Sequence, residues 1–85
     1  MTFKQLENYI SIRNEIEFMY NGKKYSITYW YPDEDEDKAF ISFCEFYKAT
    51  TEVKTAAELW NNVSREGITV GEMLSSIKQE DIYIF

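Results

Sequence analysis

The stretch EIEFMYNGKKYSITY, residues 15–29, decides the fold. Asn21 and Gly22 suit the two positive-φ positions of a type I′ turn, and β-forming residues flank them on both sides. A two-residue loop fixes the register, so that Phe18 faces Tyr25 across the hairpin. The stretch therefore predicts two antiparallel strands with one apolar face. That face carries Ile16, Phe18, Tyr20, Tyr25, Ile27 and Tyr29.

A third strand is predicted over residues 39–47. Its side chains alternate between two sides, and both sides are apolar. One side carries Ile41 and Phe43, and the other carries Phe40, Cys44 and Phe46. We expect Cys44 to be a buried structural thiol, and we expect something to cover part of the second face of the sheet, because an antiparallel strand normally has one polar side.

Three capping boxes predict three helices. The boxes pair Thr2 with Gln5, Thr55 with Glu58, and Thr69 with Glu72. The first predicts a helix over about residues 3–12. The second opens a short helix that Gly67 is expected to break, and the third opens a helix that directs Met73, Leu74 and Ile77 toward the core.

The predicted order of elements is α-β-β-β-α-α-β. Residues 49–54 are predicted to form a polar connector, and residues 82–85 a short final strand. Strands grouped first and helices grouped after them are typical of an α+β fold. We therefore expect an antiparallel β-meander of three to four strands with short helices on one face. The chain has 85 residues, no repeat and no linker, so a single domain over residues 1–85 is expected.

The second half of the chain resembles the tails of many small uncharacterised proteins of bacterial genomes and mobile elements. The residues that carry this likeness are Val53-Lys54-Thr55, Glu58-Leu59-Trp60 and the run GITVGEML at residues 67–74. Those proteins also follow a β-meander with two short helices that begin at threonines. The resemblance points to no named family, and it implies the architecture but no activity.

Cysteine usage and the N-terminal sequence indicate a cytoplasmic protein. Cys44 is the only cysteine, so no internal disulfide forms, whereas a secreted domain of this size usually needs several. Residues 1–5 lack the apolar region of a secretory signal. No run approaches the ~18–20 apolar residues of a membrane span. We therefore expect no membrane association.

The sequence lacks the groups that most enzymes use. It contains no histidine, the commonest general base. Cys44 lies within an apolar strand, a setting that raises the pKa of a thiol and makes it a poor nucleophile. No carboxylate lies in an apolar run where burial would tune it for proton transfer. We predict a protein that is not an enzyme, with no catalytic residues and no cofactor.

Five consecutive acidic residues at positions 33–37 hold nearly all of the net charge. The chain has 15 acidic and 9 basic residues and a net charge of −6, so the rest of the chain carries only −1. The three aspartates of the run have the spacing of an EF-hand loop, but Lys38 and Cys44 occupy the positions that need glycine and glutamate. No dedicated metal site is predicted, and a metal-responsive loop is kept as a weaker alternative.

The nine basic residues are scattered, and a pI near 4.5 is the reverse of a nucleic-acid-binding footprint. Direct nucleic-acid binding is therefore not expected.

The acidic run has a simple interpretation as a charged, solvated hairpin tip that keeps the protein soluble. Its neighbour Trp30 favours a second interpretation, in which the run is part of a binding site. Tyr29 belongs to the apolar face, so Trp30 must lie on the opposite face.

An exposed tryptophan ringed by polar groups is typical of a binding hot spot. The predicted partner-binding residues are Trp30, Tyr31, Asp33, Glu34, Asp35, Glu36 and Asp37. The alternative is that the C-terminal strand or a dimer partner covers Trp30.

Two functions follow from these observations. The first is a small acidic protein-binding protein without enzymatic activity, whose acidic loop docks on a basic surface of a partner. It would then resemble, in size, charge and lack of chemistry, the anti-CRISPR and anti-restriction inhibitors of phages and mobile elements that occlude nucleic-acid-binding grooves. The alternative is a structural or self-associating module, such as a homodimer, with an inert acidic loop.

Overall fold

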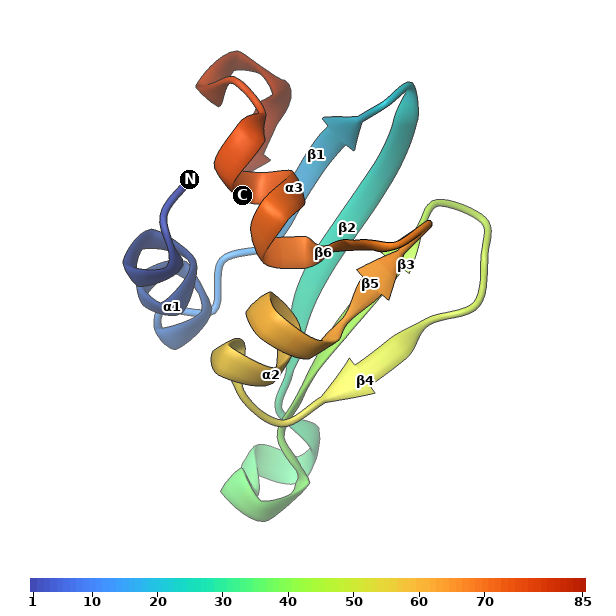
Figure 1. Cartoon of the computed structure of the whole chain (residues 1–85). Coiled ribbons are helices and arrows are strands. Elements are labelled where there is room, and N and C mark those ends of the chain that lie inside the picture. The colour runs from blue at the N-terminus through green and yellow to red at the C-terminus, as the bar shows by residue number, and fades with distance from the viewer.

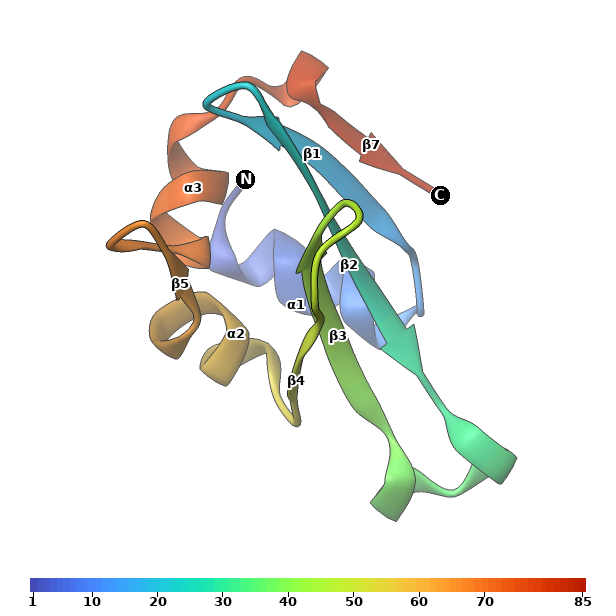
Figure 2. The ribbon, with the colours of Figure 1, turned by 90° about the vertical axis from the view of Figure 1, so that its right-hand side faces the viewer.

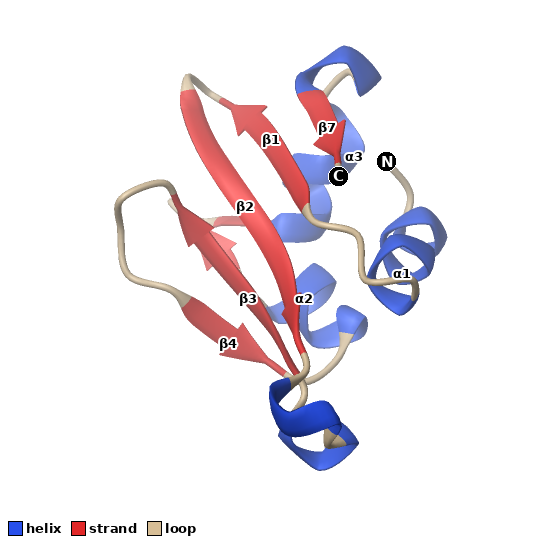
Figure 3. Ribbon diagram, turned by 180° about the vertical axis from the view of Figure 1, so that it is seen from behind, coloured by secondary structure: helices blue, strands red, loops and turns tan.

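The computed structural model describes all 85 residues as an α+β fold (Figure 1). In chain order the helices and strands are α1 (Phe3–Ser11), β1 (Ile16–Tyr20), β2 (Lys23–Trp30), β3 (Phe40–Glu45), β4 (Thr51–Val53), α2 (Ala56–Asn62), β5 (Ser64–Arg65), β6 (Ile68–Thr69), α3 (Val70–Ser76) and β7 (Ile82–Ile84). Five strands form one antiparallel sheet in the order β4-β3-β2-β1-β7, and β5 pairs with β6. The three helices lie on one face of the larger sheet (Figures 2 and 3). None of them is long and apolar enough to cross a membrane.

The central hairpin has the predicted turn and register. Asn21 and Gly22 have φ values of 51° and 78°, the left-handed conformation that a type I′ turn requires. Phe18 lies opposite Tyr25, and Ile16 lies opposite Ile27. The predicted apolar face is therefore the face that the helices cover.

The core lies between this face and the helices. Tyr25 stacks on Phe18 and on Phe43, with ring centroids 5.3 and 5.5 Å apart. Each buried aromatic side chain removes ~150–250 Å² from water, which matters in a chain this small. The buried cluster comprises Leu6, Ile10, Ile16, Phe18, Tyr25, Ile27, Ile41, Phe43, Leu59, Val63, Val70, Met73, Leu74 and Ile82.

All three helices begin at the predicted threonines. Thr2 and Thr69 form complete capping boxes, in which the threonine hydroxyl accepts from a backbone N–H and the partner side chain accepts from the threonine N–H. Thr55 accepts from the backbone N–H of Glu58. These caps satisfy backbone donors that a helix start otherwise leaves unpaired.

Residues 49–54 are predicted to form a polar connector, but half of this segment is a strand. Thr51–Val53 forms the edge strand β4, in which Val53 lies opposite Ile41 and Thr51 lies opposite Phe43. Threonine and valine are β-branched and fit a pleated surface, so even this short segment adds to the sheet. With β4 and β7 the sheet has five strands, more than the three to four expected.

The segment after α2 also differs from the prediction. The helix ends at Asn62, well before Gly67, and β5 and β6 form a second hairpin. Glu66 and Gly67 make its turn, with φ values of 56° and 80°. Gly67 therefore reverses a hairpin rather than ending a helix, because it supplies a left-handed turn position at no steric cost.

The third strand is shorter than predicted, and its outer side is half-buried. It ends at Glu45, and Tyr47 lies in the following turn with a fully exposed side chain. Cys44 is half-buried on the second face of the sheet, where its Sγ lies 3.3 Å from Ser26 Oγ. The expectation of a buried thiol is wrong, because no helix lies over this face.

Candidate protein-binding site at the acidic end of the sheet

The acidic run connects β2 to β3 at one end of the sheet. It consists of two short 3-10 turns, η1 (Pro32–Glu34) and η2 (Glu36–Lys38). This acidic tip, residues 32–38, projects beyond the helical layer (Figure 2). The molecule measures 36 × 24 × 21 Å along its principal axes. Four of its five acidic residues are exposed, so the charged segment is accessible to a partner.

Local backbone bonds shape the tip. Pro32 fixes the first position of η1, and its carbonyl accepts from the N–H of Asp35 at 3.0 Å. Asp33 and Glu34 both have left-handed backbones, with φ values of 55° and 53°. The carbonyl of Asp35 then accepts from the N–H of Lys38 at 3.0 Å. The tip is thus built from defined turns.

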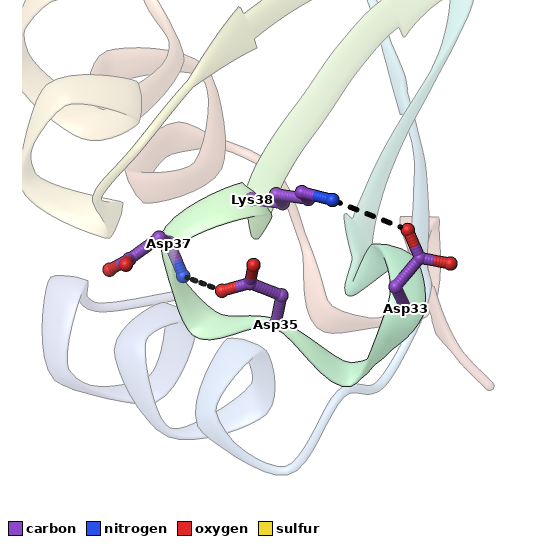
Figure 4. A network of polar contacts seen from close by, with 4 residues as sticks. All are labelled: Asp33, Asp35, Asp37 and Lys38. Atoms are coloured by element: carbon purple, nitrogen blue, oxygen red, sulfur yellow. Dashed lines mark hydrogen bonds and ion pairs between the residues drawn. The ribbon is translucent and has the colours of Figure 1, made fainter.

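The five carboxylates differ in their contacts (Figure 4). Asp33 pairs with Lys38, at 3.4 Å between Oδ2 and Nζ. Asp35 Oδ1 accepts a hydrogen bond of 2.9 Å from the backbone N–H of Asp37. The other three carboxylates, those of Glu34, Glu36 and Asp37, have no ion pair or hydrogen bond within the chain. Most of the negative charge therefore faces solvent.

The carboxylates do not converge on one point. Those of Asp33 and Asp37 lie on opposite sides of the tip and point away from each other (Figure 4). The structure contains no group of three or more acidic, cysteine or histidine side chains arranged to hold a metal ion. What the arrangement offers a partner is a diffuse negative field.

Lys54, just beyond β4, ties the tip to the edge of the sheet. Its ammonium donates to the backbone carbonyl oxygens of Asp37 and Ala39, at 3.2 and 3.1 Å. Because these acceptors belong to the backbone, the bonds leave the Asp37 carboxylate free. The lysine therefore holds the base of the tip without occupying the carboxylates that face outward.

Trp30 lies on the second face of the sheet, as strand alternation predicted. It pairs with Phe40 of β3, and the two rings stack with centroids 6.4 Å apart and planes at 21°. The Trp30 side chain is 52% exposed. A half-exposed indole supported by a neighbouring ring is well prepared for contact with a partner.

Tyr31 contacts a different set of residues from Trp30. Its ring lies 4.1 Å from the guanidinium carbon of Arg13, measured to the ring centroid, and 6.2 Å from the ring of Tyr29. Tyr31 therefore packs with a residue of the α1–β1 loop, whereas Trp30 stacks with Phe40 across the two strands that the acidic tip connects. Sequence reasoning missed Arg13, since nothing in its local sequence points to Tyr31.

No element of the chain covers the second face (Figure 3). The C-terminal strand β7 lies in the sheet beside β1 instead of over Trp30. Tyr83 of β7 is 49% exposed. The wider face also carries polar groups, which lie between its apolar side chains. They are Glu17, Lys24, Ser26, Thr28, Ser42 and Glu52.

No protein-family model, no curated protein and no solved structure matches this chain. The likeness of residues 53–74 to small bacterial and mobile-element proteins stays a prediction, and no functional residue is inferred from a relative.

Proposed function

We propose that the protein is a non-enzymatic binding protein that docks its acidic tip and Trp30 on a basic, partly apolar surface of another protein. The observation that carries this proposal is the juxtaposition of the projecting tip with a half-exposed tryptophan supported by Phe40. A charged tip alone would also suit a solubilising role. Trp30 adds a half-exposed apolar surface next to the tip, and a bound partner would exclude water from it.

The free carboxylates support an electrostatic role. Glu34, Glu36 and Asp37 have no partner within the chain, so they need not break internal contacts to meet an external cation. Complementary charge speeds association and makes it sensitive to salt. We therefore expect binding that is fast at low ionic strength and weaker as salt is added.

Trp30 would supply the part of the affinity that does not depend on salt. Tryptophan is enriched among the residues that dominate binding energy, especially where polar groups surround it. Removing its half-exposed ring from water adds an apolar term to the charge pairing. A site that combines the acidic tip with Trp30 would bind a partner surface that is both basic and apolar more tightly than a surface that is only basic.

A basic protein surface of this kind is often one that binds nucleic acid. We therefore propose an inhibitory role, in which the acidic tip occludes a nucleic-acid-binding surface of a cytoplasmic partner. Anti-CRISPR and anti-restriction proteins of phages and mobile elements work in this way as a class. The proposal rests on charge and shape, and it assigns no partner by name.

The proposal is tested by neutralising the tip. A variant with asparagine and glutamine at positions 33–37 should bind the partner at least about tenfold more weakly, a loss of ~1.4 kcal/mol. Partners are first captured with the wild-type protein and compared with those that the neutralised protein captures. The purified partner is then measured by isothermal titration calorimetry at low ionic strength. Equal affinities of the two proteins would contradict the proposal.

Trp30→Ser separates the two parts of the site. It should weaken binding at every salt concentration, whereas neutralisation of the tip should matter mainly at low salt. Tyr83→Ser is the matched control, because it removes an aromatic ring of comparable exposure from the far edge of the same face. An equal loss from both aromatic substitutions would place the contact on the whole face rather than at the acidic end.

A second candidate function is a self-associating module with an inert tip. The open second face and the free edge of β7 favour it, because both expose aromatic side chains that another copy would cover. In that case neutralising residues 33–37 would leave self-association intact.

A further inference from the structure

A small pocket opens at the edge of the sheet beside the acidic tip. It has a volume of ≈ 230 Å³. Pockets for small-molecule ligands are usually about 300–1,000 Å³, so this one has the size for a single side chain. Its lining residues come from β3, from β4 and the residue after it, and from the start of α2, and they are Phe40, Glu52, Val53, Lys54 and Glu58.

The pocket combines an apolar surface with free carboxylates. Phe40 and Val53 supply the apolar part, and Glu52 and Glu58 supply two exposed acidic groups. Neither carboxylate forms an ion pair or hydrogen bond in the structure. An occupant with an apolar stem and a cationic head would therefore satisfy both parts of the lining.

The one cation in the lining is already engaged. The ammonium of Lys54 donates to the carbonyl oxygens of Asp37 and Ala39, at 3.2 and 3.1 Å. Its head is thus directed to the base of the acidic tip, and the lining holds two carboxylates and only one ammonium. The lining keeps a negative charge that adds to the field of the neighbouring tip.

The pocket also adjoins the aromatic part of the candidate site. Phe40 lines the pocket and stacks with Trp30, so one ring belongs to both. A partner that contacts Trp30 would hold its neighbouring side chains close to the pocket. The two features therefore fit one docking surface.

We infer that this pocket receives an arginine side chain of the basic partner. The inference deepens the proposed function and rests on it. A guanidinium is planar, stacks on aromatic rings and donates to carboxylates in a fork, so it can meet Phe40 and the two glutamates together. Its methylene stem would lie against Val53. Lysine matches this lining less well, because its ammonium is compact and strongly hydrated.

The test uses two synthetic peptides and nuclear magnetic resonance on the full chain. Both peptides contain lysines, and one has a central arginine where the other has citrulline, which is similar in shape but uncharged. The arginine peptide should shift the backbone amide signals of Glu52, Val53 and Glu58. It should bind about tenfold more tightly than the citrulline peptide, since hydrogen bonds between charged groups are among the strong ones.

Two variants show where the arginine binds. Glu52→Gln with Glu58→Gln keeps the size of the side chains and removes the charge, so it should abolish the difference between the two peptides. The variant neutralised at positions 33–37 should weaken both peptides by a similar factor and keep that difference. Amide spectra of each free variant verify that the fold is intact.

Three results would overturn the inference. The first is equal affinity for the arginine and citrulline peptides, with shifts confined to residues 33–38; the proposed function would survive that result. The second is binding of neither peptide at low salt. The third is that a further peptide, with lysine at the central position, binds as tightly as the arginine peptide. A different result would count against the proposed function. In that result the arginine peptide still binds more tightly than the citrulline peptide, but neutralising residues 33–37 weakens the binding of neither.

Discussion

Tyr25 lies at the centre of the aromatic stack, between Phe18 and Phe43. Burial of the hydroxyl raises the pKa of Tyr25 above its ordinary value of 10.0, and the nearby charge of Glu45 raises it further. The unfolded chain therefore loses this proton at a lower pH than the folded protein does. The contribution of the raised Tyr25 pKa to the free energy of unfolding is complete below about pH 10, and it is lost as pH rises through that raised pKa.

We predict that the free energy of unfolding falls as pH rises above about 10, and that Tyr25→Phe makes this fall shallower. Urea unfolding at a series of alkaline pH values measures the slope. Tyr47→Phe is the matched control, because the side chain of Tyr47 is fully exposed. Lys23, whose pKa is raised by its hydrogen bond to Glu66, contributes in the same direction and stays in both variants. Equal slopes in the two variants would contradict the prediction.

The positions of single side chains were predictable only where local geometry determines them. Trp30 must face away from Tyr29 because side chains alternate along a strand. The contact of Tyr31 with Arg13 depends on how the α1–β1 loop meets the end of β2, and no local pattern encodes that. Cys44 was expected to be buried because apolar neighbours suggested a covered face, which the fold leaves open.

Among the elements, α3 shows how a short helix is held in place. Thr69 Oγ1 accepts from the backbone N–H of Glu72 at 3.1 Å, and the Glu72 carboxylate accepts from the Thr69 N–H at 3.2 Å. Met73 and Leu74 of this helix are buried in the core. A helix this short is not stable alone, so the cap and the core contacts must act together.

We therefore predict that Thr69→Ala lowers the free energy of unfolding by ~1 kcal/mol, because a backbone donor at the helix start loses its partner. Chemical denaturation measures the change. Thr50→Ala is the control, since Thr50 is exposed in a loop and its side chain makes no hydrogen bond. If both substitutions have the same small effect, the capping box does not stabilise α3.

Capped helices and the Asn21–Gly22 hairpin were predictable because each has a strong local signal. The edge strand β4 and the hairpin of β5 and β6 were not predicted, because they are very short and gain stability only by pairing. One signal for the second hairpin was present: Glu66 and Gly67 stand between two short segments, as Asn21 and Gly22 do. A glycine at the second turn position was interpreted as a helix end instead.

For the whole molecule, the decisive feature is its two unlike sides. Helices cover one face of the sheet, and the other face is open (Figure 3). The α+β class and the placement of helices on one face followed from the order of elements, since grouped strands and helices pack in that way. The small pocket beside the acidic tip was not predictable, because it depends on how β4 and α2 meet Phe40.

The open face mixes aromatic side chains with charged and hydroxyl groups, and the chain carries a net charge of −6. Like charges oppose association of copies, so we predict a monomer of 10.2 kDa over a range of concentrations. Sedimentation equilibrium measures the mass. A concentration-dependent dimer that Trp30→Ser or Tyr83→Ser disrupts would favour the self-associating module over the proposed function.

The most direct test of the central claim compares two variants with the same net charge. One replaces the unpaired acids of the tip, in Glu34→Gln, Glu36→Gln and Asp37→Asn. The other replaces three exposed acids elsewhere, in Glu7→Gln, Glu15→Gln and Glu80→Gln. Calorimetry at low ionic strength measures the affinity of each for the purified partner. A localised site predicts a loss of several-fold to about tenfold from the tip variant and little change from the other. Equal losses from the two variants would show that total charge, and not the acidic tip, governs binding.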